Sequence, residues 1–199
     1  MIEQVLHPHN VQRALKQVVA NKGSAGVDGM KVCELTDYFR KERTQLYSSI
    51  REMNYLAQPI FGVDIPKGNG KTRLLGIPTV TDRVLQQAVS QVLMPKYESE
   101  FSVSSYGFRP NKSARQAVGK ALEHIREGFS FIVDIDLKTF FDEVDHCLLL
   151  NLLHQKVKCP ITMRLIRKWL QAPIQINGKL HKRRKGVPQG SPLSPLLAN

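Results

Sequence analysis

The sequence has few cysteines, no long apolar run and, in its last quarter, no acidic residue. Its three cysteines, Cys33, Cys147 and Cys159, are too few and too scattered for a disulfide framework or a zinc site. No run reaches the roughly 18 apolar residues that a membrane-spanning helix requires. The start, MIEQVLHPHN, lacks the basic-then-apolar pattern of a signal peptide. We therefore expect a cytoplasmic protein with no membrane partner.

The lack of acidic residues after Asp145 concentrates positive charge in one part of the chain. The whole sequence carries 29 Lys+Arg against 17 Asp+Glu, a formal net charge of +12. Its last 54 residues contain ten bases and no acid. Such a block attracts polyphosphate in a salt-dependent way. Charge favours nucleic acid over a solubilising face or an anionic membrane surface, because the sequence shows no amphipathic membrane anchor.

The 199 residues, 42% apolar and 23% charged, suffice for one globular domain. Helices and strands mix without a strict βαβ rhythm, which predicts an α+β fold. Apolar periodicity and capping residues predict helices over 8–22, 34–53, 82–93, 111–128, 145–157 and a segment starting at Pro160. Pro95 is expected to end the helix predicted over 82–93. Hairpins are predicted at Lys67–Lys71 (KGNGK) and at Asn177-Gly178.

The stretch FIVDIDLKTFFDEVDH, residues 131–146, concentrates carboxylates at the end of an apolar run. Alternation predicts a strand over 131–137 with one face in the core and with Asp134 and Asp136 on the other face. Two carboxylates about 7 Å apart on one face repel unless a cation neutralises them. A divalent metal such as Mg²⁺ is one remedy. A hydrated strand end that enters solvent explains the pattern equally well at this point.

Five segments together resemble the reverse transcriptases encoded by bacterial and organellar group II introns. DIDLKTFFDEVDH resembles that family's first catalytic motif, and GVPQGSPLSPLLAN resembles its later nucleotide-pocket motif. GSAGVDG, RLLGIPTVTDRVLQQAV and YGFRPNKSARQAV are similar to its N-terminal and fingers motifs. The resemblance covers nearly the whole chain in the family's order. It implies an RNA-directed DNA polymerase, a nucleotidyltransferase that adds dNTPs to a primer 3′-hydroxyl by two-metal phosphoryl transfer.

The resemblance also implies a metal site. Asp136 matches the catalytic, metal-binding aspartate, and the backbone carbonyl of Leu137 is a further ligand by the same analogy. The metal is Mg²⁺, with Mn²⁺ as a substitute. Asp134 falls on an upstream acidic position that is not an essential ligand in the family.

Nucleotide-binding residues follow from the same motifs. Phe141 matches the aromatic residue beneath the sugar of the incoming nucleotide, where a bulky ring excludes a 2′-hydroxyl. Gln189 and Gly190 match the pair that contacts this nucleotide. Lys67 and Arg73 correspond to the bases that clamp its triphosphate, and Lys71 is an alternative to Lys67.

Other bases are expected to bind nucleic acid. Arg109 is assigned either to the template or to the fold, with equal weight. His146 is expected to be a structural hydrogen-bonding residue. The remaining predicted nucleic-acid contacts lie in one basic segment, at Lys179, Lys182, Arg183, Arg184 and Lys185.

One departure from the family pattern limits these expectations. The family's other catalytic carboxylates lie in a Tyr-x-Asp-Asp turn that this sequence does not contain. The chain therefore resembles a fragment with fingers and the beginning of the palm of a right-hand polymerase, with no thumb. Its expected division is fingers over 1–81, palm with the first catalytic strand over 82–145, fingers over 146–185 and truncated palm over 186–199.

The isolated fragment is expected to be inactive and to bind metal weakly or not at all. The expected partners are RNA template, intron RNA, DNA primer and dNTP. A homodimer is also expected, through exposed palm surface at Leu193, Leu196 and Leu197. The alternative function is a non-catalytic module that binds intron RNA, as in the family's maturase role in splicing.

Overall fold

The computed structural model describes residues 1–68 and 70–199. The helices are α1 (Ile2–Val5), α2 (Pro8–Ala20), η1 (Val32–Glu34), α3 (Leu35–Arg51), α4 (Val80–Tyr97), α5 (Ala114–Arg126), α6 (Phe140–Glu143), α7 (His146–Lys156), α8 (Pro160–Gln171) and α9 (Ser194–Ala198). The strands are β1 (Ile60–Gly68), β2 (Lys71–Ile77), β3 (Ile174–Ile176) and β4 (Lys179–His181). This mixture confirms the α+β class.

Helix starts follow the capping residues in the sequence. Pro8 and Pro160 occupy the first turns of α2 and α8, where a missing N–H costs nothing. Thr79, Ser113 and Asp145 cap α4, α5 and α7, each accepting a hydrogen bond from the backbone N–H three residues ahead. The predicted helices therefore form close to their predicted bounds.

Helix α4 is the centre of the core. Its residues from Val80 to Leu85 are buried on every side, and it packs against α1 and α2. Apolar residues of α3, α7 and α8 belong to the same buried cluster. The prediction that Pro95 ends this helix is wrong, since α4 continues to Tyr97. Pro95 lies in the last turn, where only one intrahelical hydrogen bond is lost.

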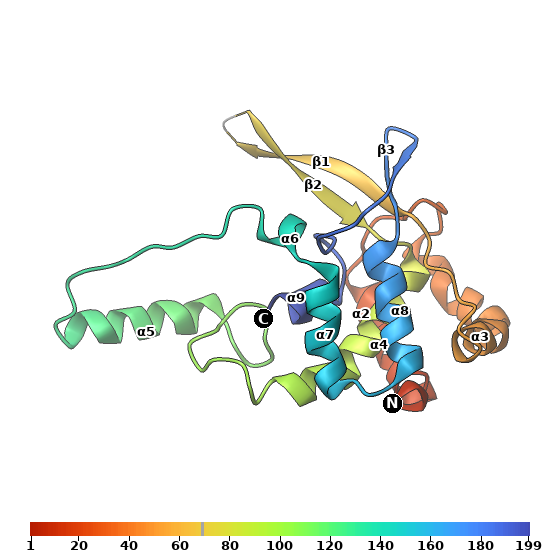
Figure 1. Cartoon of the computed structure of the whole chain (residues 1–199), viewed down its shortest axis with the longest axis horizontal. Helices are drawn as coiled ribbons and strands as arrows, with labels where there is room; N and C mark the ends of the chain where they lie inside the picture. Colours follow the sequence, from red (N-terminus) through yellow and green to blue (C-terminus); the bar gives the residue numbers. More distant parts are fainter. Residues whose placement is uncertain (69) are drawn as a thin grey trace.

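The sheet has the strand order β2-β1-β3-β4. Strands β1 and β2 form an antiparallel hairpin whose register shifts between Pro66 and Gly68. Asn69, in the predicted KGNGK turn, lies outside the described residues. The β3–β4 hairpin turns at Asn177 and Gly178, both with positive φ, as predicted. Both hairpins project from the same side of the helical body (Figure 1).

A buried polar network joins α4 and α8 to the segment before β1. The Asp82 side chain, 1% exposed, accepts hydrogen bonds from Tyr55 Oη at 2.7 Å, Trp169 Nε1 at 2.6 Å, Thr79 Oγ1 at 3.1 Å and the Gln58 N–H at 3.2 Å. Burial raises the pKa of the Asp82 carboxyl, and these hydrogen bonds offset part of that rise. The network fixes where α4 begins.

The predicted core-packed strand over 131–137 is not present. The segment is extended and solvent-exposed, Phe131 is 95% exposed, and among the described residues no strand pairs with it. The apolar face of α5, at Val118, Leu122 and Ile125, is also exposed. Figure 1 shows α5 and this returning segment standing apart from the helical body. Alternating residues define two faces of a strand, but they do not supply a pairing partner.

The predicted exposed surface at Leu193, Leu196 and Leu197 is also corrected. Leu193 is 2% exposed and Leu196 is 4% exposed, and both belong to the main apolar cluster. Leu197 is half-buried against it. Of the three leucines expected at a homodimer surface, only Leu197 therefore keeps part of its side chain exposed. Across the described residues, no helix combines the length and the apolar character needed to cross a bilayer.

Candidate functional site

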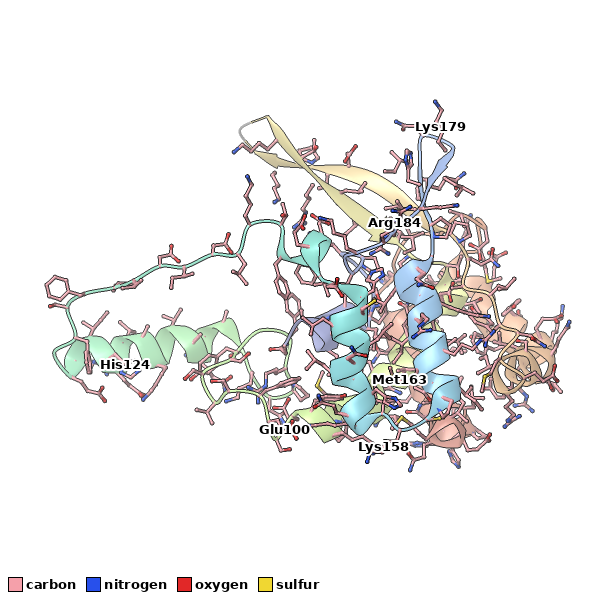
Figure 2. All side chains as sticks on the ribbon, viewed as in Figure 1. Glu100, His124, Lys158, Met163, Lys179 and Arg184 are labelled. Carbon is pink, nitrogen blue, oxygen red and sulfur yellow. The ribbon has the colours of Figure 1, made fainter. Side chains whose placement is uncertain are left out.

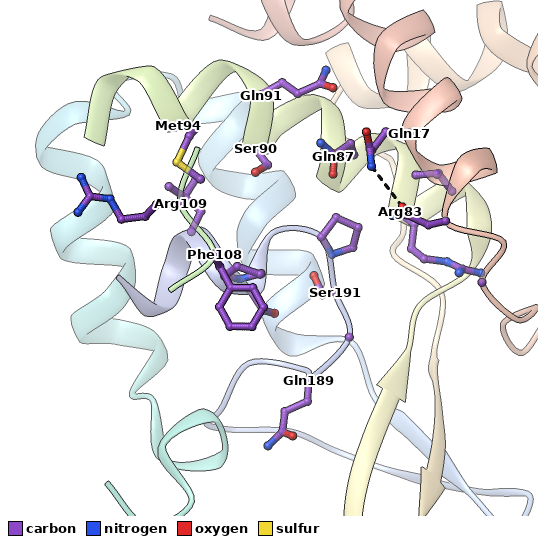
Figure 3. Close-up of a pocket in the computed structure, with 18 of the residues that line it drawn as sticks. Gln17, Arg83, Gln87, Ser90, Gln91, Met94, Phe108, Arg109, Gln189 and Ser191 are labelled. Atoms are coloured by element: carbon purple, nitrogen blue, oxygen red, sulfur yellow. Dashed lines mark hydrogen bonds between the residues drawn. The ribbon is translucent and has the colours of Figure 1, made fainter. Parts of the chain in front are cut away.

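A cavity of about 1070 Å³ opens between the helical body and the β1–β2 hairpin. Its walls come from α2, β2, α4, the segment around Phe108, α6 and the segment from Gln189 to Leu196 (Figure 3). Four residues predicted from three separate motifs line it together: Arg73, Phe141, Gln189 and Gly190. The fold thus gathers most of the predicted nucleotide-binding set in one place.

The segment with Gln189 and Gly190 lies directly on β2. The Gly76 N–H donates to the Gln189 carbonyl at 2.9 Å. Gly190 has φ +110°, and a Cβ there would lie 3.0 Å from the Gly76 carbonyl oxygen. Only glycine allows this conformation and this close approach without strain. Ser191 fastens the same segment to α4 by donating from Oγ to Gln86 Oε1 at 2.8 Å.

Arg73 is the base of the hairpin that reaches the cavity. It is opposite Ile65 in the β1–β2 ladder, and its side chain is exposed. Lys67 lies at the register shift in β1 and Lys71 begins β2; both are exposed and lie outside the cavity lining. Arg73 therefore lines the cavity, and the choice between the two lysines stays open.

Phe141 lies in the short helix α6 and is half-buried at the cavity wall. Its ring meets that of Phe140 edge to face, with centroids 5.6 Å apart. The preceding Thr139 has φ +52°, an unusual conformation for a β-branched residue. The turn is held by hydrogen bonds to the Thr139 carbonyl from the N–H groups of Asp142 and Glu143. The hydrogen bonds of this turn and the contact with Phe140 therefore fix the position of the Phe141 ring at the cavity wall.

The predicted metal ligands lie outside the cavity lining. Asp136 and Leu137 belong to the exposed extended segment, as does Asp134. Among the described residues, no group of three or more His, Cys, Asp or Glu side chains is placed to hold an ion. Mg²⁺ is commonly bound by one or two carboxylates together with substrate phosphates. The Asp136 carboxylate and the Leu137 carbonyl therefore fit an Mg²⁺ site that substrate phosphates complete. They are too few to form a site from protein ligands alone.

The charged side chains that line the cavity are all positive among the described residues. Within the part of the chain that the structure describes, its lining includes four arginines and no Asp or Glu: Arg13, Arg73, Arg83 and Arg109. Acid-free walls raise the local concentration of anionic ligands. This chemistry fits a phosphorylated ligand.

Two polar rows that the motif analysis did not identify also line the cavity. One runs along α2 and the other along α4, and Figure 3 shows Gln17 and Gln87 on these two helices. Each row repeats every four residues, the spacing of one helix face. The α2 row is Arg13, Gln17 and Asn21, and the α4 row is Arg83, Gln87 and Gln91. This spacing is visible in the sequence and could have revealed both rows.

Arg83 is buried, whereas Gln87 and Gln91 in the same row are only half-buried. Its Nη2 donates to the Ser24 carbonyl, which holds the glycine-rich turn against α4. Among the described residues, its Nε is buried without a partner. Burial lowers the pKa of Arg83.

Arg109 is occupied by the fold, which favours the structural alternative for this residue. The residue is 8% exposed, and every guanidinium nitrogen has a hydrogen-bond partner. It forms an ion pair with Glu98 at 2.8 Å and donates to the carbonyls of Ser102 and Ser105. It also lies over the Phe101 ring.

The basic segment 179–185 divides into exposed and inward-facing residues. Lys179, Lys182 and Arg184 are exposed on and beside the β3–β4 hairpin, and Figure 2 shows Lys179 at its outer end. Lys185 forms an exposed ion pair with Glu143 at 2.5 Å. Arg183 turns inward and donates from Nη2 to the Gly186 carbonyl at 2.7 Å, and burial lowers its pKa.

The chain is similar in sequence to known proteins of one family. The sequence model of the family described as "Reverse transcriptase (RNA-dependent DNA polymerase)" matches residues 65–199. The chain is 37% identical over 197 residues to the group II intron-encoded protein LtrA of Lactococcus lactis subsp. cremoris, covering 98% of this chain and 32% of LtrA. It is 31% identical over 205 residues to protein YkfC of Escherichia coli (strain K12), covering 100% of this chain and 54% of YkfC.

More distant similarity extends to splicing proteins and to a solved structure. Nuclear intron maturase 1, mitochondrial, of Arabidopsis thaliana is 28% identical over 94 residues, 47% of this chain and 13% of that protein. A chain of a partial Cas6-RT-Cas1–Cas2 complex superposes with a TM-score of 0.64 at 28% identity, covering 98% of this chain and 32% of that one. The chain thus spans about a third of LtrA and about half of YkfC.

Proposed function

Because the chain belongs to the reverse transcriptase (RNA-dependent DNA polymerase) family, with group II intron-encoded proteins among its relatives, we propose that its cavity binds an incoming dNTP and the RNA template nucleotide that selects it. The observation that carries this proposal is the meeting of Arg73, Phe141, Gln189 and Gly190 in one acid-free cavity. In this proposal residues 1–81 and 146–185 are fingers, and residues 82–145 and 186–199 are palm.

The β2 end of the cavity suits the nucleotide. The Arg73 guanidinium can donate to two phosphate oxygens at once, which a carboxylate-free surrounding strengthens. Lys67 or Lys71 adds a point charge from the exposed hairpin. Phe141 offers a ring against the sugar, and the Gln189 amide offers both a donor and an acceptor.

The α2–α4 end suits an RNA strand. Arg13 and Arg83 provide positive charge, and the carboxamides of Gln17 and Gln87 can both donate and accept hydrogen bonds. The Gln91 amide nitrogen donates to the carbonyl and the Oδ1 of Asn10, at 3.0 Å and 2.8 Å, so Gln91 offers only its oxygen as an acceptor. RNA is distinguished by its 2′-hydroxyl, which also donates and accepts. Unstacked template bases therefore find matching groups here, while the arginines neutralise phosphate.

Mg²⁺ would neutralise triphosphate charge when bound. Asp136 and the Leu137 carbonyl are the residues of this chain that would hold it, and substrate phosphates would complete the coordination. Since the described residues offer a single metal carboxylate in the family's motif, metal binding by this chain alone is expected to be weak.

In proteins of the relatives' length, we expect RNA-directed DNA synthesis from a primer 3′-hydroxyl. The isolated 199 residues are expected to be inactive. Primer extension on an RNA template with Mg²⁺ and dNTPs checks this. Efficient templated synthesis by the 199-residue chain would refute the expected inactivity.

Nucleotide binding tests the site itself. Fluorescence polarisation with a labelled dNTP, competed by unlabelled dNTP, should show saturable binding. Arg73→Gln should weaken it about tenfold or more, because a hydrogen bond to a charged group is lost. Arg40→Gln, an exposed arginine on α3 paired with Asp37, is the matched control and should leave the affinity unchanged. Equal loss in both variants would show that only net charge matters.

A second function, binding of intron RNA without catalysis, is favoured by the exposed bases at Lys179, Lys182 and Arg184. Relatives named as intron maturases support it. Steeply salt-dependent binding of structured RNA that survives Asp136→Ala would support this function. RNA binding that depends on Asp136 and on Mg²⁺ would count against it.

A further inference from the structure

The turn with Phe141 and the segment that leads to Gln189 are held together by residues outside the cavity. The Val187 N–H donates to the Phe141 carbonyl at 2.7 Å. The Gly186 N–H donates to the Val144 carbonyl, also at 2.7 Å. Next to these bonds, Asp145 and Lys185 form an antiparallel bridge. Any shift of residues 185–187 therefore moves both Phe141 and the start of the nucleotide-binding segment.

The Gly186 carbonyl is the centre of this connection. His146 Nε2 lies 2.8 Å from it, and the pair is buried. A carbonyl only accepts, so His146 carries a proton on Nε2 and donates it. Arg183 Nη2 donates to the same oxygen at 2.7 Å. Two donors thus hold this carbonyl in a single orientation.

Position 186 has room for glycine alone. Its φ is +83°, and a Cβ there would lie 2.8 Å from the Asp142 carbonyl oxygen and 2.9 Å from that of Phe141. Both neighbours are backbone atoms, so a side chain would push the whole α6 turn away. The same turn begins at Thr139, whose φ of +52° is unusual for a β-branched residue.

We infer that His146 and Gly186 are positioning residues that set the place of the Phe141 ring and thereby the preference of the site for deoxyribose over ribose. This rests on the proposed nucleotide site. Neither residue lines the cavity, so both act through the backbone of the α6 turn. His146 begins α7, and that helix anchors the connection in the core through Leu149 and Leu150.

The test compares competition of the labelled dNTP by Mg·dATP and by Mg·ATP. The wild-type chain should prefer dATP. His146→Leu removes the hydrogen bond and should lower the dATP/ATP preference about fivefold. His146→Gln keeps an N–H at similar reach and should retain most of the preference, whereas His146→Asn is too short and should not. His154→Leu, an exposed histidine two turns along α7, is the matched control.

A double substitution separates positioning from general loss of structure. If His146 acts through Phe141, then His146→Leu should change the preference less than about twofold in a Phe141→Ala background. An equal drop in both backgrounds would overturn the inference. So would an unchanged preference in folded His146→Leu or in His146→Asn. A wild-type chain that binds neither nucleotide would instead overturn the proposed function, and this inference with it.

Discussion

Replacing Asp82 by asparagine exchanges one oxygen for an NH₂ group inside the network that fixes the start of α4. Four donors surround the carboxylate, and two of them can only donate: the Gln58 N–H and Trp169 Nε1. They contact different carboxylate oxygens, Oδ2 and Oδ1. Whichever way the asparagine amide is turned, its NH₂ therefore faces a donor.

The magnitude follows from the groups left without partners. A buried unsatisfied polar group costs about 1–3 kcal/mol. Here both the new amide N–H and the donor opposite it are affected, which gives about 2–6 kcal/mol. For a domain of this size that corresponds to a fall in Tm of about 4–24 °C. Tyr55→Phe removes one hydrogen bond and should cost about 1 kcal/mol.

Urea unfolding followed by circular dichroism measures these differences. Asp37→Asn, an exposed aspartate on α3, is the matched control and should change stability by less than about 0.5 kcal/mol. Burial raises the pKa of Asp82, so its contribution to stability is greatest below the unfolded pKa and declines as pH rises through the folded pKa. The stability difference between wild type and Asp82→Asn should therefore be larger at pH 4 than at pH 7. An unchanged urea midpoint at both pH values would refute the reasoning.

Three further predictions concern other parts of the chain. Arg109→Ala should lower the free energy of unfolding by about 2–3 kcal/mol, because Glu98 and two backbone carbonyls lose their donor. The RNA affinity of the folded variant should stay unchanged. Melting curves measure the first effect and filter binding the second. Replacing Lys179, Lys182 and Arg184 by glutamine should reduce the slope of log K against log[salt] for RNA by about 0.7 per lost phosphate contact. Chymotrypsin should cut at the exposed Phe131 before any site in the core, as mass spectrometry of early fragments would show.

Local structure could be predicted well from the sequence because it depends on nearby residues. Ser113 and Asp145 cap helices that form near their predicted bounds, and Asn177-Gly178 forms its predicted turn. The motif residues Arg73, Phe141 and Gln189 meet in one cavity, although over a hundred residues separate the first from the last. Recognition of the family, rather than periodicity, supplied that expectation.

Long-range pairing and side-chain surroundings could not be predicted in this way. The alternation over 131–137 indicates an extended chain, but a strand also needs a neighbour. The apolar pattern of α5 predicts a face and not what covers it. The positive charge of Arg109 alone is compatible with a template contact. Its hydrogen bonds to Ser102 and Glu98 show that its donors are used within the fold. The polar rows on α2 and α4 were visible in the sequence but had no motif to mark them.

Template-directed selection of the nucleotide is the direct test of the proposed cavity site. The measurement is the affinity of each of the four dNTPs, with Mg²⁺, for the chain mixed with a DNA primer on RNA templates that differ in the one base opposite the incoming nucleotide. We expect the complementary dNTP to bind tightest on every template, and Arg73→Gln to weaken the binding of all four dNTPs together. Affinities that ignore the template base, or that are the same without RNA, would contradict it.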